Sequence, residues 1–125
     1  MAKTKATYVD GFVLTVPKKK LAAYKKMATV GRNLWLKHGA LDYKECIGND
    51  LKSKWVTFTF PKMAKAKAGE LVVFSYITYK SRTHRDQVNA KVMKDPLMKA
   101  PKKKTPMPFD MKRMAYGGFT VLVSA

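Results

Sequence analysis

The sequence predicts an α+β domain of the ferredoxin-like class, with the element order strand, helix, strand, strand, helix, strand. Four stretches are rich in the apolar, β-branched and aromatic residues typical of strands. Two segments between them repeat apolar residues at spacings of three and four, as amphipathic helices do. In this class the strands form one antiparallel four-stranded sheet, and both helices cover the same face. A length of 125 residues suits one domain, so we assign residues 1–125 to a single unit.

The first half of the chain supplies a strand, a long helix and a second strand. The first six residues are polar and are expected to be disordered. Tyr8 to Val16 has the composition of a strand. The helix that follows keeps its apolar stripe as far as His38, and Gly39 is its expected C-cap. Ala40 to Gly48 alternates apolar and polar residues, which predicts a half-buried strand.

The second half begins with an ambiguous segment, residues 51–69. Within it, Trp55 to Phe60 resembles a strand, whereas Pro61 and the Lys/Ala run after it favour a mobile loop. Glu70 to Tyr79 is nearly continuous in apolar residues, which predicts a central strand. Ser81 can cap a short helix that ends at Asp95-Pro96.

The last part of the chain is expected to be a long loop followed by a strand. Residues 97–112 hold three prolines and three consecutive lysines, which predicts an irregular connection. Arg113 to Val123 has the composition of the final strand. Gly117-Gly118 within it indicates either a β-bulge or a close approach of another chain segment.

Composition narrows the class of protein. A hydrophobic content of 46% favours a globular chain over a disordered one. No apolar run reaches the ~20 residues of a membrane helix, and the N-terminal residues lack the apolar core of a signal peptide. The single cysteine, Cys46, has no partner for an internal disulfide, as is typical of a reducing compartment. We therefore expect a cytoplasmic protein without membrane association.

The chain is strongly basic, with 26 Lys and Arg against 8 Asp and Glu and a net charge of +18. Such an excess favours polyanions through counterion release, and RNA or DNA would bind at the lysine clusters Lys18, Lys19, Lys20 and Lys102, Lys103, Lys104. Most of the excess is lysine, however, whereas planar readout of phosphates and bases favours arginine. A surface that serves solubility is the alternative interpretation.

His84 is the candidate catalytic residue. It lies in the first turn of the predicted second helix, where the helix dipole favours a neutral imidazole that can accept a proton. Arg82 and Arg85 could hold an anionic substrate beside it. In the alternative interpretation, Arg85 pairs with Asp86 on the surface and His84 packs on Val88.

Two acidic residues, Asp10 and Glu45, interrupt apolar strands, which is costly unless they are paired or lie at an edge. They either flank a pocket, to which we also assign Tyr43 and Arg113, or form salt bridges with Lys44 or Arg113. The sequence contains no metal-ligand spacing, phosphate loop, dinucleotide fingerprint or nucleophile elbow. We therefore predict neither a metal nor a cofactor.

Apolar and aromatic side chains occur on both faces of the predicted strands, among them Phe12, Val13, Phe74, Tyr76 and Phe119. Two helices can cover only one of these faces. Because a large uncovered apolar face marks an interface, the pattern predicts a homodimer that packs sheet against sheet.

Several stretches together resemble the YbaA-like family of small bacterial proteins. They are YVDGFVLTVP, the helix ending in Trp35 with His38-Gly39-Ala40, VVFSYITYKSRTHRD, VNAKVMKDP and MPFDMKRMAYGGF, and the similarity runs from Tyr8 to Val123. The family has no established function and belongs to the dimeric α+β barrel superfamily. The resemblance therefore implies a ferredoxin-like protomer and a face-to-face dimer. The basic charge departs from the family pattern.

Three hypotheses for function follow from these observations. The first is a protein that binds or transforms a small molecule in a pocket near the dimer sheet, by analogy with enzymes of the superfamily. The second is a polyanion-binding module that uses the lysine clusters. The third is a structural or stress-related dimer without a ligand.

Overall fold

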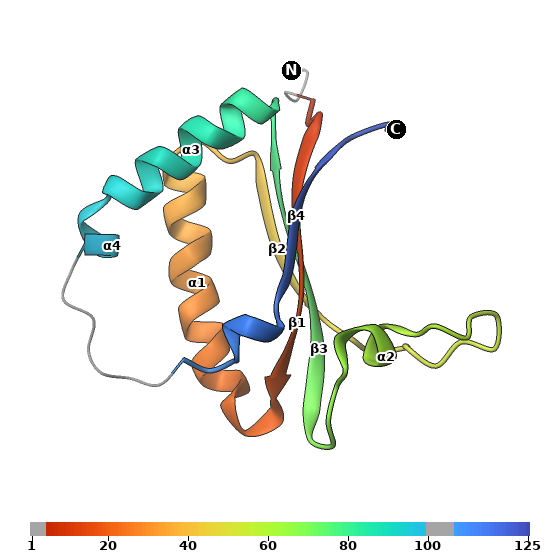
Figure 1. Ribbon diagram of the computed structural model, residues 1–125. Coiled ribbons are helices and arrows are strands. Elements are labelled where there is room, and N and C mark those ends of the chain that lie inside the picture. The colour runs from red at the N-terminus through yellow and green to blue at the C-terminus, as the bar shows by residue number, and fades with distance from the viewer. Residues whose placement is uncertain (1–4, 100–106) are drawn as a thin grey trace.

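The strands form one layer, and the two longest helices form a second layer on one side of it (Figure 1). A computed structural model describes residues 5–99 and 107–125. The strands are β1 (Tyr8–Pro17), β2 (Asp42–Ile47), β3 (Glu70–Tyr79) and β4 (Ala115–Thr120). The α-helices are α1 (Leu21–Lys37), α2 (Phe60–Ala64), α3 (Arg82–Lys94) and α4 (Pro96–Lys99). Two 3-10 turns, η1 (Lys18–Lys20) and η2 (Met111–Arg113), precede α1 and β4.

The four strands form one antiparallel sheet in the order β2-β3-β1-β4. The predicted α+β class and four-stranded antiparallel sheet are thus confirmed. The β1–β3 pairing runs without interruption from Tyr8 opposite Tyr79 to Pro17 opposite Glu70. The prediction that the most apolar strand lies inside the sheet is also confirmed, because β3 has β2 on one side and β1 on the other.

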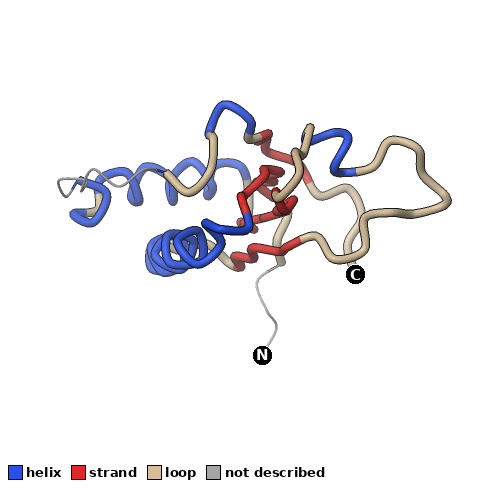
Figure 2. The backbone as a smooth tube through the Cα atoms, turned by 90° about the horizontal axis from the view of Figure 1, so that it is seen from below, coloured by secondary structure: helices blue, strands red, loops and turns tan. Residues whose placement is uncertain are grey.

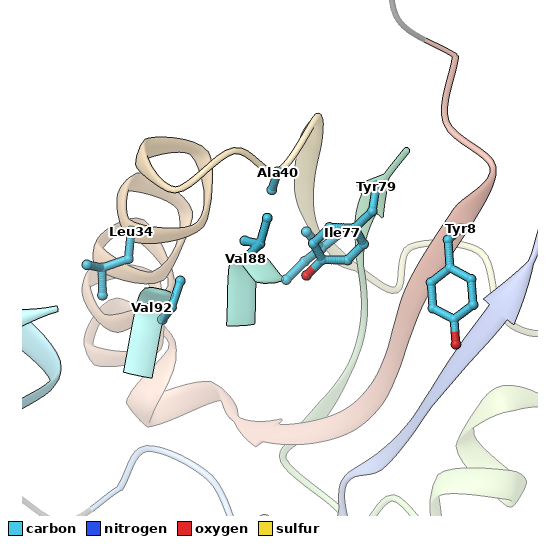
Figure 3. Close-up of a cluster of buried hydrophobic side chains, with 7 residues drawn as sticks. All are labelled: Tyr8, Leu34, Ala40, Ile77, Tyr79, Val88 and Val92. Atoms are coloured by element: carbon cyan, nitrogen blue, oxygen red, sulfur yellow. The ribbon is translucent and has the colours of Figure 1, made fainter. Parts of the chain in front are cut away.

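The two long helices, α1 and α3, lie on the same face of the sheet (Figures 1 and 2). Leu34 of α1 packs with Val88 and Val92 of α3 against Ile77 and Tyr79 of β3 (Figure 3). A second buried cluster joins the other end of α1 to β1 and β3; its members are Leu14, Val16, Tyr24, Ala28 and Val73. Complete burial of such a side chain stabilises the fold by roughly 1.5–3 kcal/mol, so these clusters hold the helices on this face.

The ends of α3 follow the sequence signals closely. The Ser81 hydroxyl accepts a hydrogen bond from the His84 N–H at 3.0 Å, and the helix stops at Asp95, before Pro96. The predicted helix cap and helix end are therefore confirmed. Gly39, just beyond α1, has a φ of +113°, in the left-handed region that favours glycine.

Two expectations about irregular segments are wrong in part. Trp55 to Phe60 is not a strand. Pro61 lies in the first turn of α2, where a backbone N–H has no partner within the helix, so the missing N–H of proline costs no hydrogen bond. The Thr59 hydroxyl caps this helix by accepting a hydrogen bond from the Lys62 N–H at 3.4 Å. The predicted loop of residues 97–112 contains most of α4 and all but the last residue of η2. Its residues 100–106 lie outside the described part of the chain.

Gly118 allows a close contact between β4 and β1. The register between these strands is continuous from Tyr8 opposite Thr120 to Val13 opposite Ala115, so there is no bulge in this pairing. A Cβ atom at Gly118 would overlap the Tyr8 hydroxyl. Of the two predicted roles of the glycine pair, the close approach is therefore the one found. The strand ends at Thr120, earlier than predicted.

The second face of the sheet is covered only in part. Residues 49–69, which we call the arm, project from this face on the side opposite α1 and α3 (Figures 1 and 2). The arm includes α2. Thr15 of β1 and Val72 of β3 are buried on this face of the sheet. Beyond it, Phe74 is 44% and Phe119 61% exposed, and Trp55 in the arm is 93% exposed. The molecule therefore presents aromatic side chains both on the open sheet and on the arm.

Candidate functional site

Glu45 is the centre of a hydrogen-bonded cluster on the helix-covered face of the sheet. The Tyr24 hydroxyl and the Ser75 hydroxyl each donate a hydrogen bond to Glu45 Oε1 at 2.7 Å. The Tyr43 hydroxyl donates one to Oε2, also at 2.7 Å. We call these four residues the Glu45 cluster. They come from α1, β2 and β3, so the cluster links three elements.

Strand register and helix placement bring these groups together. Glu45 lies directly opposite Ser75 in the β2–β3 pairing, and Tyr43 shares its face because alternate strand residues point the same way. The helix passes close above them at Gly31, where a Cβ atom would stand 3.0 Å from the Tyr43 hydroxyl. A larger residue at this position of α1 would therefore press on the cluster.

No Lys, Arg or His in the described part of the chain forms a salt bridge with Glu45. The neighbouring Lys44 instead pairs with Asp42 at 3.0 Å. Burial, together with the hydrogen bond and the negative charge of Glu45, raises the pKa of Tyr24 and Tyr43 far above the ordinary value. Both phenols therefore stay protonated and remain hydrogen-bond donors to the carboxylate.

The Glu45 cluster lines a cavity of about 470 Å³ between α1 and the sheet. Its other walls are almost entirely apolar and include Phe12, Leu34, Ile77, Met98, Phe109 and Met114. Glu45 is the one charged residue among the described residues that line it. The volume lies in the range of small-molecule sites, and apolar walls with few polar groups are typical of such sites.

A second hollow, a groove of about 580 Å³, lies on the other side of the cluster along the edge strand β2. Tyr24, Tyr43 and Glu45 line both volumes. The groove differs in charge, because Lys25, Arg32 and Lys44 also line it. The cluster thus stands between an apolar cavity and a basic groove.

Asp10 lies in a different place, buried against the first turn of α3. The Nη1 atom of Arg85 lies 3.0 Å from Asp10 Oδ1 and donates a hydrogen bond to the Tyr116 hydroxyl at 2.7 Å. The Nε atom of Arg85 forms a salt bridge with Asp86 at 2.8 Å. Burial raises the pKa of Asp10, and the Arg85 charge opposes that rise. This ion pair joins α3 to β1 and β4, and neither Asp10 nor Arg85 lines the cavity or the groove.

His84 also lies apart from the cavity. Its Nδ1 accepts a hydrogen bond from the Lys80 backbone N–H at 2.9 Å, and its ring meets the edge of Tyr79 with centroids 5.9 Å apart. Burial and the nearby charge of Lys80 lower the pKa of His84. The imidazole is therefore neutral at physiological pH and stabilises the turn between β3 and α3. Arg82, in the same turn, is exposed.

Arg113 forms a two-point contact with Glu70, with Nη1 to Oε2 at 2.7 Å and Nη2 to Oε1 at 2.9 Å. The proposed salt bridges of Asp10 and Glu45 with Lys44 or Arg113 are therefore wrong, since Lys44 and Arg113 hold other carboxylates. Of the predicted pocket residues, the structure brings Tyr43 and Glu45 together at the cavity. It places Asp10 with Arg85 elsewhere.

Sequence reasoning missed Tyr24 and Ser75 as parts of the site. Ser75 is a polar residue inside the most apolar strand, at an inward position, and this was the available signal. Tyr24 follows the apolar stripe of its helix and gave no separate signal. Of the lysine clusters, Lys18, Lys19 and Lys20 are exposed in η1, while Lys102, Lys103 and Lys104 lie outside the described residues. Polyanion binding stays a prediction.

The described residues contain no group of three or more His, Cys, Asp or Glu side chains placed to hold a metal ion. Among the helices of that same part of the chain, none combines the length and the apolar character needed to cross a membrane.

The comparisons with known proteins agree with one another. The chain is 46% identical over 116 residues to the uncharacterized protein YbaA of Escherichia coli K12, covering 93% of this chain and 97% of the relative. The uncharacterized protein YbaA of Shigella flexneri matches with the same identity and coverage. A family model described as "Protein of unknown function (DUF1428)" matches residues 7–111. The chain therefore belongs to this family of YbaA-like proteins of unknown function.

Proposed function

We propose that this protein binds a small molecule in the cavity between α1 and the sheet, with Glu45 as the polar anchor. The observation that carries the proposal is a carboxylate without a described cationic partner in an otherwise apolar cavity. Glu45 is half-buried, and partial removal of a carboxylate from water costs free energy that an apolar residue of similar size would avoid. A ligand that uses the carboxylate accounts for its presence.

The same group suits chemistry as well as binding. A carboxylate held in a fixed position can act as a general base toward a bound molecule. The three hydroxyl donors fix the orientation of Glu45, which such a role requires. We therefore place a catalytic role, if the bound molecule is transformed, on Glu45 rather than on His84, which does not line the cavity.

A cavity-filling variant tests the proposal. Ala28 lines the cavity and is 9% exposed, whereas Ala23 lies on the solvent side of the same helix. A neutral fluorescent dye that binds apolar sites should bind Ala28→Leu at least about tenfold more weakly than wild type, a loss of about 1.4 kcal/mol. Ala23→Leu, the matched control, should bind it as wild type does.

Circular dichroism and thermal melting establish that both variants are folded before the dye titration is compared. Equal dye affinities for wild type, Ala28→Leu and Ala23→Leu would show that the cavity is not the binding site. Displacement of the dye by candidate metabolites would then identify the class of natural ligand.

We further propose that the protomer is ferredoxin-like and forms a dimer through the second face of the sheet. The strand order β2-β3-β1-β4, with α1 and α3 on one face, supports the first part. The exposure of Phe74, Phe119 and Trp55 supports the second, because single domains rarely leave several aromatic side chains in water on one side. The ligand cavity lies on the opposite face, so the dimer leaves it accessible.

A further inference from the structure

Among the described residues that line the cavity, every side-chain donor is already engaged within the protein. The hydroxyls of Tyr24, Tyr43 and Ser75 donate to Glu45. Trp35, the remaining polar side chain among the described lining residues, donates its indole N–H to Asn89 Oδ1 at 3.0 Å. None of these groups has a hydrogen left for a ligand.

The hydrogen-bond acceptors of the cavity, by contrast, still have free lone pairs. A carboxylate offers about four lone-pair sites, and the cluster fills three of them, which leaves one on Oε2. Each hydroxyl oxygen also keeps lone pairs after it donates. The raised pKa values of Tyr24 and Tyr43 keep these hydroxyls as donors to Glu45 across the physiological range. The polar side of the cavity therefore offers a ligand hydrogen-bond acceptors.

We propose that the cavity selects apolar molecules whose polar group is a hydrogen-bond donor, a hydroxyl or an amine, and rejects carboxylates and phosphates of the same size. This inference rests on the proposed function and names its ligand class. A donor completes the free lone pair of Glu45 without disturbing the three existing bonds. An anionic ligand would meet a like charge and, among the described lining residues, no free side-chain donor, and both cost binding energy in an apolar cavity.

The test uses a matched series of ligands on one rigid hydrocarbon cage: adamantylmethanol, adamantylmethylamine, adamantylmethyl methyl ether and adamantane carboxylate. The first two donate hydrogen bonds; the ether and the carboxylate only accept them. None of the four absorbs where tryptophan fluoresces. The chain has two tryptophans, and Trp55 is 93% exposed in the arm, so Trp55→Phe leaves Trp35 as a single reporter in the cavity wall.

In this background the alcohol and the amine should bind at least about tenfold more tightly than the ether and the carboxylate, as expected for one hydrogen bond to a charged group. Glu45→Gln keeps the shape of the side chain, removes the charge and adds an N–H donor. It should reduce the donor preference to about twofold or less and improve carboxylate binding. Asp50→Asn, which removes an acid from an exposed loop position, should leave the order of affinities unchanged.

The outcomes separate the two proposals. If all four compounds bind with similar affinity, or the carboxylate binds best, the donor selectivity is wrong while the cavity remains a binding site. If donor preference persists unchanged in Glu45→Gln, Glu45 does not select the ligand and the inference is likewise overturned. If none of the four changes Trp35 fluorescence or melting temperature, the proposed small-molecule site fails and the selectivity fails with it.

Discussion

His84 is placed where a second proton would break a hydrogen bond. Its Nδ1 accepts the Lys80 N–H at 2.9 Å, and a protonated imidazole has no lone pair there. Burial, Lys80 and Lys91 all lower the pKa of His84 from its usual 6.5. Its folded-state pKa is therefore below the unfolded one, so it contributes stability above pH 6.5 that is lost as pH falls.

We expect His84→Asn to reduce this pH dependence. The Asn side-chain oxygen can accept the same Lys80 N–H but does not titrate. The melting temperature of wild type should fall by a few degrees more than that of the variant between pH 7 and pH 5. Parallel melting curves for the two proteins over this range would contradict the assignment. A His84→Phe control, which removes the acceptor altogether, should be less stable at pH 7.

At the scale of elements, Arg113 connects segments that are not neighbours in the sheet. It joins η2, before β4, to Glu70 at the start of β3, and also donates to the Lys65 carbonyl at 2.8 Å. The two-point contact lowers the pKa of Glu70 to about 2. It attaches the end of the long connection to the sheet.

Glu70→Gln should therefore lower stability at neutral pH and weaken its acid dependence. Because the pKa of Glu70 falls from 4.5 in its free form to about 2 when folded, its contribution is present above pH 4.5 and is lost between pH 4.5 and 2. Urea unfolding at pH 7, 4.5 and 3 should show the gap between wild type and variant closing as pH falls. Asp50→Asn provides the charge control, and a constant gap would argue against the ion pair.

At the scale of the molecule, the two faces of the sheet differ in what covers them. One carries α1, α3 and the cavity, and the other carries the arm and exposed aromatic side chains (Figure 1). With a net charge of +18 on each copy, a dimer through the second face must overcome electrostatic repulsion. Apolar contact has to provide the attraction, and salt should strengthen the association by screening the charge.

Lysine substitutions at two equally exposed apolar residues test whether this face forms the dimer. Phe74 on the open sheet face is 44% exposed, and Leu36 on α1 is 43% exposed. Size-exclusion chromatography with light scattering should give a dimer for wild type and Leu36→Lys and a monomer for Phe74→Lys. The wild-type dimer should dissociate more readily at low salt. A monomeric wild type at high protein concentration and high salt would exclude the proposed association.

Much of the local structure could be predicted because its signals are local. The ten-residue strand β3 and the Ser81 cap of α3 follow from composition and from a hydroxyl three residues before the N–H that it binds. The structure of the arm was harder to predict, because Trp55 to Phe60 has strand composition but no strand of the sheet pairs with it. Without a partner strand, the local preferences of Thr59 and Pro61 start a helix instead.

The candidate site was predictable only in part for the same reason. Glu45 was noticeable as an acid in an apolar strand, and a pocket beside it was one of two interpretations. Tyr24 and Ser75, however, lie 21 and 30 residues away from it along the chain. Only the β2–β3 register and the path of α1 bring their hydroxyls to its carboxylate.

The sequence by itself thus determined the α+β class, the positions of the four strands and of α1 and α3, and the family. The tertiary structure alone decided which acid meets which partner: Asp10 an arginine of α3, Glu70 an arginine before β4, and Glu45 three hydroxyls and a cavity. The physical reason is range. Periodicity and capping act over a few residues, whereas a site arises where strand register and helix packing converge on groups that are distant in the chain.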